Sequence, residues 1–347
     1  MARWTSLLLT PLLAIVSIMG CGGITENVQQ RQSRLDIVKK RGTSICGVSG
    51  TLPGFSFVDE SGKYSGIDVE VCRAVAAALF DNPDAVEYRN LEASERFTAL
   101  NGGEVDVLSR NTTWTLGRDS LVGMEFAPTT FYDGQGMMVR KDSKIGSLQD
   151  LQGASICVGT GTTTELNLTD TMRQAKVNFT PIAYQQADAT FGAYLEGRCE
   201  GVTADKSALV ARRSNFPNPQ EHIILDITMS KEPLGPATIN NDSAWFDVVK
   251  WVTYALIEAE ELGITSANVE QMKKSDNPTI RRFLGVEGAL GEGLGLSNDF
   301  TARIVKHVGN YGEVYDRNLG KNSQIKLPRG ENDLWTRGGL LYSPPFR

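Results

Sequence analysis

Apolar positions follow two alternating patterns in the first half of the chain, beginning at Leu35. One pattern is a short continuous run, which is typical of a buried strand. The other recurs every four residues, as from Ile67 to Leu79, and predicts a helix. The predicted elements are strands at 44–48, 85–88 and 105–109, a turn at 53–54 and a second helix at 94–101. Strands that alternate with helices indicate βαβ units and a mostly parallel sheet.

The same alternation resumes after residue 145. Ser147 and Asp150 have the spacing of a capping box, which predicts a short helix. The later predicted elements are strands at 155–158, 178–183 and 201–204, a helix ending near 175 and a helix at 187–196.

Extended segments connect the two blocks. Residues 131–139 carry Gly134 and Gly136, which we interpret as hinge positions where the backbone can bend. Residues 233–239 predict a return crossing, and residues 244–262 predict the longest helix. The pattern therefore favours two α/β lobes joined by two extended crossings.

The first twenty residues have the layout of an export signal. Arg3 precedes an apolar stretch, 7–19, that is too short to cross about 30 Å of hydrocarbon. Ile18–Cys21 resembles a bacterial lipobox, in which the cysteine is acylated; simple cleavage and a retained anchor are the alternatives. We expect a signal peptide over 1–20, a tether over 21–34 and a periplasmic protein, attached to the membrane only through a lipid on Cys21.

Composition excludes several classes of protein. A length of 347 residues corresponds to roughly two domains. The net charge of −6 argues against a nucleic-acid partner, because nucleic-acid binders present a basic face. The two histidines, His222 and His307, lie far apart, so no metal centre is expected.

Four cysteines remain after Cys21 is set aside, an even number that suits an oxidising compartment. Four cysteines allow three pairings, which sequence alone does not separate. We favour one bridge in each lobe and keep four free thiols as the alternative. The favoured pairs are Cys46 with Cys72 and Cys157 with Cys199.

Polar residues follow the ends of three predicted strands, where open α/β sheets bind ligands. The turn 159–165 is rich in Gly and Thr and suits an anion such as a carboxylate, although a simple threonine-capped helix fits equally. Arg118 ends the loop 110–118 and offers a fork for a carboxylate, whereas Asp205 can pair with an ammonium group. An α-amino acid has both groups, but each residue alone fits a surface ion pair.

Longer motifs connect these residues to a known family. The segment 66–79 resembles the signature of family 3 bacterial solute-binding proteins, the extracytoplasmic receptors of amino-acid ABC importers. The general L-amino-acid-binding branch is similar over 95–100, 105–118, 132–140, 159–168 and 245–264. The resemblance implies a two-lobed periplasmic-binding-protein fold (type II, Venus-flytrap). Its expected parts are lobe 1 over 35–133, lobe 2 over 134–239, and return helices with a C-terminal extension over 240–347.

The resemblance also implies roles for individual residues. Arg118 resembles the arginine that clamps the α-carboxylate, helped by Thr113 and by Thr162 or Thr163, and Asp205 resembles the acid that holds the α-ammonium. Phe97 is similar to the aromatic that covers the ligand, and Arg96 to an arginine directed at a side-chain carboxylate. The ligand-binding candidates are Arg96, Phe97, Asn111, Thr113, Arg118, Thr162, Thr163 and Asp205. Leu52 precedes Pro53 where basic-amino-acid binders usually carry an aromatic, which argues against a lysine or histidine receptor.

The expected function is binding without catalysis. The protein would capture acidic and neutral polar L-amino acids by hinge closure and deliver them to the membrane subunits of an ABC permease, without a cofactor. An enzyme of the same fold is one rival, for which Asp205 and Glu165 are the nearby candidate acids. A sensor or receptor ectodomain is the other.

Overall fold

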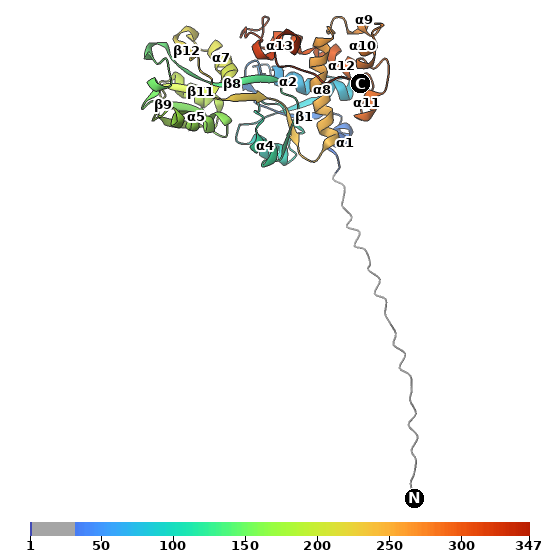
Figure 1. Cartoon of the computed structure of the whole chain (residues 1–347), viewed down its shortest axis with the longest axis horizontal. Coiled ribbons are helices and arrows are strands. Elements are labelled where there is room, and N and C mark those ends of the chain that lie inside the picture. The colour runs from blue at the N-terminus through green and yellow to red at the C-terminus, as the bar shows by residue number, and fades with distance from the viewer. Residues whose placement is uncertain (2–31) are drawn as a thin grey trace. The chain divides into compact units, whose positions relative to one another are not determined.

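The computed structural model describes residue 1 and residues 32–347, so the predicted signal peptide and Cys21 lie outside the described residues. Helix α1 (Arg34–Arg41) begins directly after Ser33 (Figure 1). The Ser33 hydroxyl caps this helix by accepting from the backbone N–H of Leu35, at 3.2 Å. The predicted end of the tether at residue 34 is therefore slightly late, because Ser33 and Arg34 already belong to the helix and its cap.

The first lobe contains a five-stranded sheet in the order β5-β1-β6-β14-β7. β1 pairs in parallel with β5 and β6, whereas β14 is antiparallel to β6 and β7 because it returns from the other lobe. The strands are β1 (Ser44–Val48), β5 (Val86–Asn90), β6 (Val107–Leu108), β7 (Met124–Phe126) and β14 (Ala237–Ile239). A small sheet beside it consists of β2 (Thr51–Leu52), β3 (Ser56–Val58) and β4 (Tyr64–Ser65).

Three helices of this lobe connect the strands: α2 (Ile67–Phe80), α3 (Arg96–Asn101) and α4 (Leu116–Ser120). α2 is apolar on nearly all sides, and such a helix is stable only when it is buried. It packs against β1 on one side and against later helices on the other.

The second lobe contains a sheet in the order β10-β9-β11-β8-β12, of which β10, β9 and β11 are parallel. Its strands are β8 (Phe131–Arg140), β9 (Ser155–Gly159), β10 (Thr180–Tyr184), β11 (Gly201–Asp205) and β12 (His222–Ile224). Its helices are α5 (Thr163–Gln174), α6 (Ala187–Leu195) and α7 (Lys206–Ser214). The short helix predicted after Ser147 is a 3-10 turn, Gln149–Leu151, because the Asp150 carboxylate accepts from the Ser147 N–H and holds a tight turn.

Two antiparallel strands, β8 and β13 (Lys231–Leu234), cross between the lobes. In Figure 1, β8 runs from the region of α2 into the sheet that contains β11. Gly134 lies on the crossing, opposite Lys231, whereas Gly136 pairs with Ala204 inside the second sheet. Gly136 therefore lies beside the crossing, within the second sheet, and the hinge role of both glycines stays a prediction.

Neither glycine position has room for a Cβ atom. A Cβ at Gly134 would lie 2.6 Å from Thr228 Cγ2, and one at Gly136 would lie 2.9 Å from Lys206 Cγ. Close packing, rather than a bend of the backbone, therefore requires glycine at these two positions.

The last third of the described chain covers the first lobe. α8 (Ser243–Glu261) is the long helix predicted from the sequence, and α12 (Phe300–Val308) packs on both α2 and α8. The other helices here are α9 (Val269–Met272), α10 (Pro278–Phe283), α11 (Leu290–Gly293) and α13 (Tyr311–Asn318). Near the end of the chain, Asn332 lies beside the crossing and contacts Tyr132. Its Oδ1 accepts from the Tyr132 N–H at 2.6 Å, and its Nδ2 donates to the Tyr132 carbonyl oxygen at 3.0 Å.

One disulfide lies in each lobe. Cys46 of β1 is bonded to Cys72 of α2, and Cys157 of β9 is bonded to Cys199. These are the two pairs that the sequence analysis favoured. The bridged residues are 26 and 42 positions apart, for which loop-closure entropy gives a stabilisation of roughly 3–4 kcal/mol each.

Residues 32–347 include no helix that is both long enough and apolar enough to cross a bilayer. The same residues include no group of three or more His, Cys, Asp and Glu side chains arranged to hold a metal ion.

Candidate functional site

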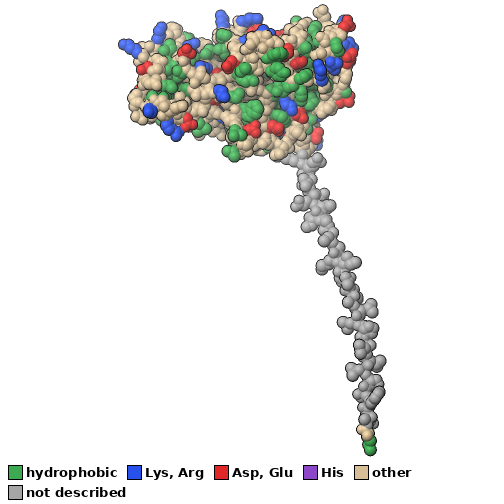
Figure 2. Space-filling view, in the orientation of Figure 1, with side chains coloured by type: hydrophobic (Ala, Val, Ile, Leu, Met, Phe, Trp, Pro, Cys, Tyr) green, Lys and Arg blue, Asp and Glu red, His purple; other side chains and the backbone are tan. Residues whose placement is uncertain are grey.

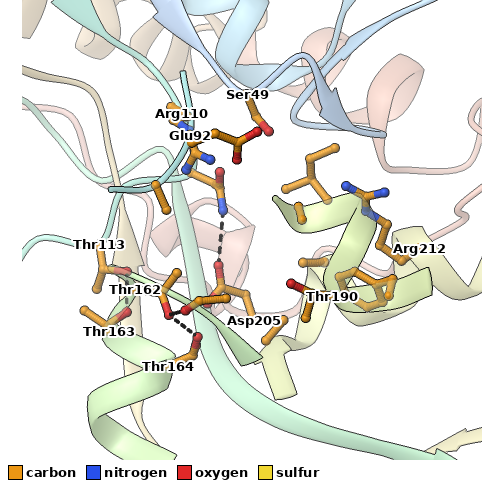
Figure 3. A pocket seen from close by; sticks show the side chains of 18 of the residues that line it. Ser49, Glu92, Arg110, Thr113, Thr162, Thr163, Thr164, Thr190, Asp205 and Arg212 are labelled. Carbon is orange, nitrogen blue, oxygen red and sulfur yellow. Dashed lines mark hydrogen bonds between the residues drawn. The ribbon is translucent and has the colours of Figure 1, made fainter. Parts of the chain in front are cut away.

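A cavity of about 110 Å³ lies between the two lobes, at the carboxyl ends of their parallel strands (Figure 3). Six of the eight ligand-binding candidates line it: Arg96, Asn111, Thr113, Thr162, Thr163 and Asp205. Phe97 and Arg118 are not among the lining residues. The strand-end rule applied to the sequence thus brings together residues as far apart as Asn111 and Asp205, which are separated by 94 positions.

The two lobes touch around this cavity. Asn111 Nδ2 approaches Asp205 Oδ2 at 3.4 Å, and the hydroxyls of Thr113 and Thr163 lie 3.4 Å apart (Figure 3). On the far side, Arg212 Nη2 donates to Thr51 Oγ1 at 3.2 Å. These contacts from one lobe to the other describe a closed cleft.

Asp205 ends β11 and stands at the N-cap position of α7, where an aspartate side chain normally caps the helix. Its side chain makes no capping bond and lines the cavity instead. Burial raises the pKa of Asp205 well above its usual range, and the nearby Asp133 and Glu232 carboxylates raise it further. A cationic group placed beside Asp205 would offset this cost, and an α-ammonium is such a group.

Arg96 is the first residue of α3 and supplies the opposite charge. It is 3% exposed, and its Nε has no hydrogen-bond partner among the described residues. Burial lowers the pKa of Arg96 well below its usual range, and the Arg110 and Arg118 charges lower it further. A buried guanidinium without an anion beside it is costly, so an anionic ligand group would be stabilised here.

Phe97 and Arg118 lie next to two residues of the cavity wall, Arg96 and Thr113. The Phe97 ring packs against two guanidinium groups, with its centroid 5.0 Å from Arg96 Cζ and 5.1 Å from Arg118 Cζ. Arg118 Nη1 donates to the backbone oxygen of Thr113 at 2.8 Å. The ligand contacts of Phe97 and Arg118 stay predictions, and both residues adjoin the cavity wall, Phe97 through Arg96 and Arg118 through Thr113.

The turn 159–165 combines the two interpretations that the sequence left open. Thr162 Oγ1 caps α5 by accepting from the Glu165 N–H at 3.1 Å, and Glu165 Oε2 accepts from the Gly161 N–H at 2.9 Å. Thr162 and Thr163 nevertheless line the cavity. The turn is thus a capped helix start whose next residue, Thr163, faces the site.

Several lining residues were missed from the sequence. Arg110 lies two residues after the end of β6, so the strand-end rule could have found it; its pKa is lowered to about 10 by burial. Phe191 and Arg212 come from α6 and α7, whose sequence patterns indicate helices and nothing more. Glu232, on β13, does not line the cavity; it accepts from the hydroxyls of Thr113 and Thr163, which do, and no local motif marks it.

Comparisons with known proteins agree with this geometry. Residues 45–281 match the family of bacterial extracellular solute-binding proteins, family 3. The general L-amino acid-binding periplasmic protein AapJ of Rhizobium johnstonii is 51% identical over 315 residues, which cover 90% of this chain and 92% of AapJ. The glutamate/glutamine/aspartate/asparagine-binding protein BztA of Rhodobacter capsulatus is 48% identical, covering 91% of this chain and 94% of BztA.

A solved structure is also similar. It is an ABC transporter periplasmic binding protein from Brucella ovis with glutathione bound, 48% identical, with a TM-score of 0.89. The match covers 91% of this chain and all of that one, at 100%. The family match, the identity to these relatives and the shared fold lead to one conclusion: the chain belongs to the family 3 bacterial extracellular solute-binding proteins.

Proposed function

We propose that this protein captures an L-α-amino acid in the cavity between its lobes and delivers it to the membrane subunits of an ABC importer. The observation that carries the proposal is a pair of buried, opposite charges on one cavity. Asp205 comes from the second lobe and Arg96 from the first, and neither has an ion-pair partner in the part of the chain that the structure describes. A zwitterion with an acidic or amide side chain supplies a partner for each.

The charge around the cavity favours glutamate, aspartate and their amides. Arg96, Arg110 and Arg212 line it, against Glu92 and Asp205. These lining side chains carry a net charge of +1. Because the zwitterionic part of an amino acid is neutral, this positive charge is left to pair with the side chain of the ligand. The name of BztA includes the same four amino acids. A cavity of about 110 Å³ also suits a single amino acid better than the roughly 300 Å³ or more of a drug-sized ligand.

Glutathione is a second candidate, favoured by the bound structure from Brucella ovis. Its γ-glutamyl end has the same α-amino and α-carboxylate groups as glutamate. Because glutathione is much larger than an amino acid, it would need a less closed cleft than the one described here.

The proposal also includes export and excludes a nucleic-acid partner. We infer that residues 1–20 direct the chain out of the cytoplasm and that acylated Cys21 tethers it to the membrane. The face in Figure 2 carries interspersed acidic and basic side chains rather than the basic patch of a nucleic-acid binder.

Titration calorimetry tests the proposed ligand. The purified protein, freed of bound solute by unfolding and refolding, is titrated with L-glutamate, L-glutamine, L-serine, D-glutamate and glutathione. We expect L-glutamate and L-glutamine to bind at least tenfold more tightly than D-glutamate, since the mirror image cannot place its ammonium group, α-carboxylate and side chain at all three binding positions together. Mass spectrometry should recover every ligand unchanged.

Binding of glutathione alone would favour the second candidate. Recovery of a ligand with an altered mass would favour the enzyme instead.

A further inference from the structure

A second hollow lies between the two lobes, next to the ligand cavity. It has a volume of about 450 Å³, against about 110 Å³ for the cavity. Phe191 and Arg212 line both spaces, so these two side chains form the partition between them. The other lining residues come from both lobes and include Thr51, Pro53, Phe57, Gly192, Leu195 and Phe216. The cleft therefore has room for more than the amino acid that the cavity itself accepts.

Arg212 is held in the partition by contacts that a ligand can replace. Its Cζ lies 5.2 Å from the centroid of the Phe191 ring, and its Nη2 donates to Thr51 Oγ1 of the other lobe at 3.2 Å. Its Nη1 donates to Asp188, whose side chain is 66% exposed, and an ion pair of this kind contributes little. Its Nε is buried and has no hydrogen-bond partner among the described residues. A carboxylate beside Arg212 would therefore form stronger, bidentate hydrogen bonds than the present contacts.

The partition stands at the end of the cavity that a long side chain would reach. In Figure 3, Arg212 and Thr190 lie on the opposite side of the cavity from Thr113 and Thr163. The family resemblance implies that Thr113 and Thr163 help to hold the α-carboxylate, so the side chain of the ligand points toward Arg212. A ligand longer than glutamate would thus meet Arg212 first and the hollow next.

The hollow combines an apolar lining with one cation. Among the described residues that line it, Arg212 is the only lysine or arginine. The apolar part of the lining consists of Pro53, Phe57, Val58, Phe191, Leu195 and Phe216. These features suit an amino-acid residue that has an apolar side chain and a free carboxylate. Such a residue is connected to the cavity when an amide bond joins it to the side-chain carboxyl of glutamate, which gives a γ-glutamyl dipeptide.

We propose that the protein also binds γ-glutamyl dipeptides whose second residue is apolar. The glutamyl part lies in the cavity, with its γ-amide oxygen in the place of the side-chain carboxylate beside Arg96. The second side chain lies in the hollow, and its carboxylate pairs with Arg212, which leaves Thr51. This assignment rests on the proposed function and extends it to a second class of ligand.

Two isomeric dipeptides test the assignment in the wild type, freed of bound solute. γ-L-Glutamyl-L-leucine keeps the free ammonium and α-carboxylate of glutamate, whereas α-L-glutamyl-L-leucine has its glutamyl α-carboxyl in the peptide bond. We expect calorimetry to show that the γ isomer binds about 100-fold more tightly than the α isomer, because only the γ isomer presents both groups in the cavity.

The variant Gly192→Phe fills the hollow and leaves the cavity unchanged. Gly192 is on α6 and lines only the hollow, and a Cβ there would have no atom within 4 Å. We expect the variant to bind γ-L-glutamyl-L-leucine about 10-fold or more weakly and L-glutamate within about threefold of the wild type. Gly293→Phe on α11, where a Cβ also has no atom within 4 Å, is the matched control and should bind both ligands as the wild type does.

A second variant, Arg212→Met, tests the pairing with the second carboxylate. γ-L-Glutamyl-L-leucinamide is the same ligand with that carboxylate replaced by a neutral amide. We expect Arg212→Met to weaken the dipeptide about 10-fold more than it weakens the amide, as for loss of a charge-assisted hydrogen bond. This comparison also covers the case that Gly192→Phe folds poorly.

The assignment would be overturned by a folded Gly192→Phe protein that loses both ligands equally or neither. Equal losses of the dipeptide and its amide in Arg212→Met would also overturn it. A wild type that binds L-glutamate and not the γ dipeptide would do the same and would leave the proposed function standing. Failure of the wild type to bind any amino acid would contradict the proposed function and this assignment together.

Discussion

Asp205→Asn should nearly abolish binding of every amino acid, whatever its side chain. The substitution keeps the shape of the side chain and removes the buried charge that faces the ammonium group. Loss of one member of a buried charged pair typically costs about 3–4 kcal/mol, on the order of a 100- to 1,000-fold loss of affinity. Calorimetry with L-glutamate, L-glutamine and L-serine should show the same loss for all three.

The same substitution should stabilise the empty protein. Burial and the neighbouring carboxylates raise the pKa of Asp205 in the folded state, so its ionised form is unfavourable at neutral pH. A folded pKa above the unfolded value of about 3.9 means that stability is full below that value and is lost as the pH rises through the folded pKa. We expect Asp205→Asn to add about 1 kcal/mol at pH 7 and to flatten this loss.

Chemical unfolding between pH 4 and pH 8 measures both effects. Burial raises the pKa values of Asp68 and Asp133 to about 6, so part of the fall in stability with rising pH should remain in both the wild type and the variant. The exposed Asp170 gives the matched control, since Asp170→Asn should change neither affinity nor stability at neutral pH. An Asp205→Asn protein with near-native affinity would remove Asp205 from the site.

Arg96→Met should change the choice of ligand rather than binding in general. Methionine fills similar space without the buried charge, so the variant loses the partner of a side-chain carboxylate. We expect L-glutamate to lose about 2–3 kcal/mol, near 100-fold, with a smaller loss for L-glutamine and little change for L-serine. Calorimetric titrations with these three ligands measure the order of the affinity losses.

The empty Arg96→Met protein should also unfold at a higher denaturant concentration, because the buried guanidinium has no anion beside it. Arg173→Met, on the exposed face of α5, is the control and should leave all three affinities unchanged. Equal losses for the three ligands would mean that Arg96 supports the structure of the lobe. No loss for any of them would mean that Arg96 does not reach the ligand.

The sequence predicted most of the fold because the local patterns and the tertiary packing agree. The apolar run at 44–48 is β1, the stripe from Ile67 is α2, and the segment 131–139 is nearly all of β8. The positions of Asp205 and Asn111 followed from one topological rule about the ends of parallel strands.

The remaining features depend on contacts that no local pattern encodes. Phe97 packs against the Arg96 and Arg118 guanidinium groups, and Arg118 donates to the Thr113 carbonyl oxygen, although the motif alone shows neither contact. Arg212 lines the site because α7 turns it toward Thr51 of the other lobe. Glu232 accepts from Thr113 of the first lobe and from Thr163 and Asn167 of α5, contacts that its local sequence does not predict.

A crystal structure of the protein with L-glutamate tests the central claim most directly. The ligand should lie in the cavity between the lobes, with its ammonium group within hydrogen-bond distance of Asp205. Its side-chain carboxylate should lie against Arg96. Density for the ligand outside this cavity, or a ligand bound in the reverse orientation with a carboxylate against Asp205, would contradict the account.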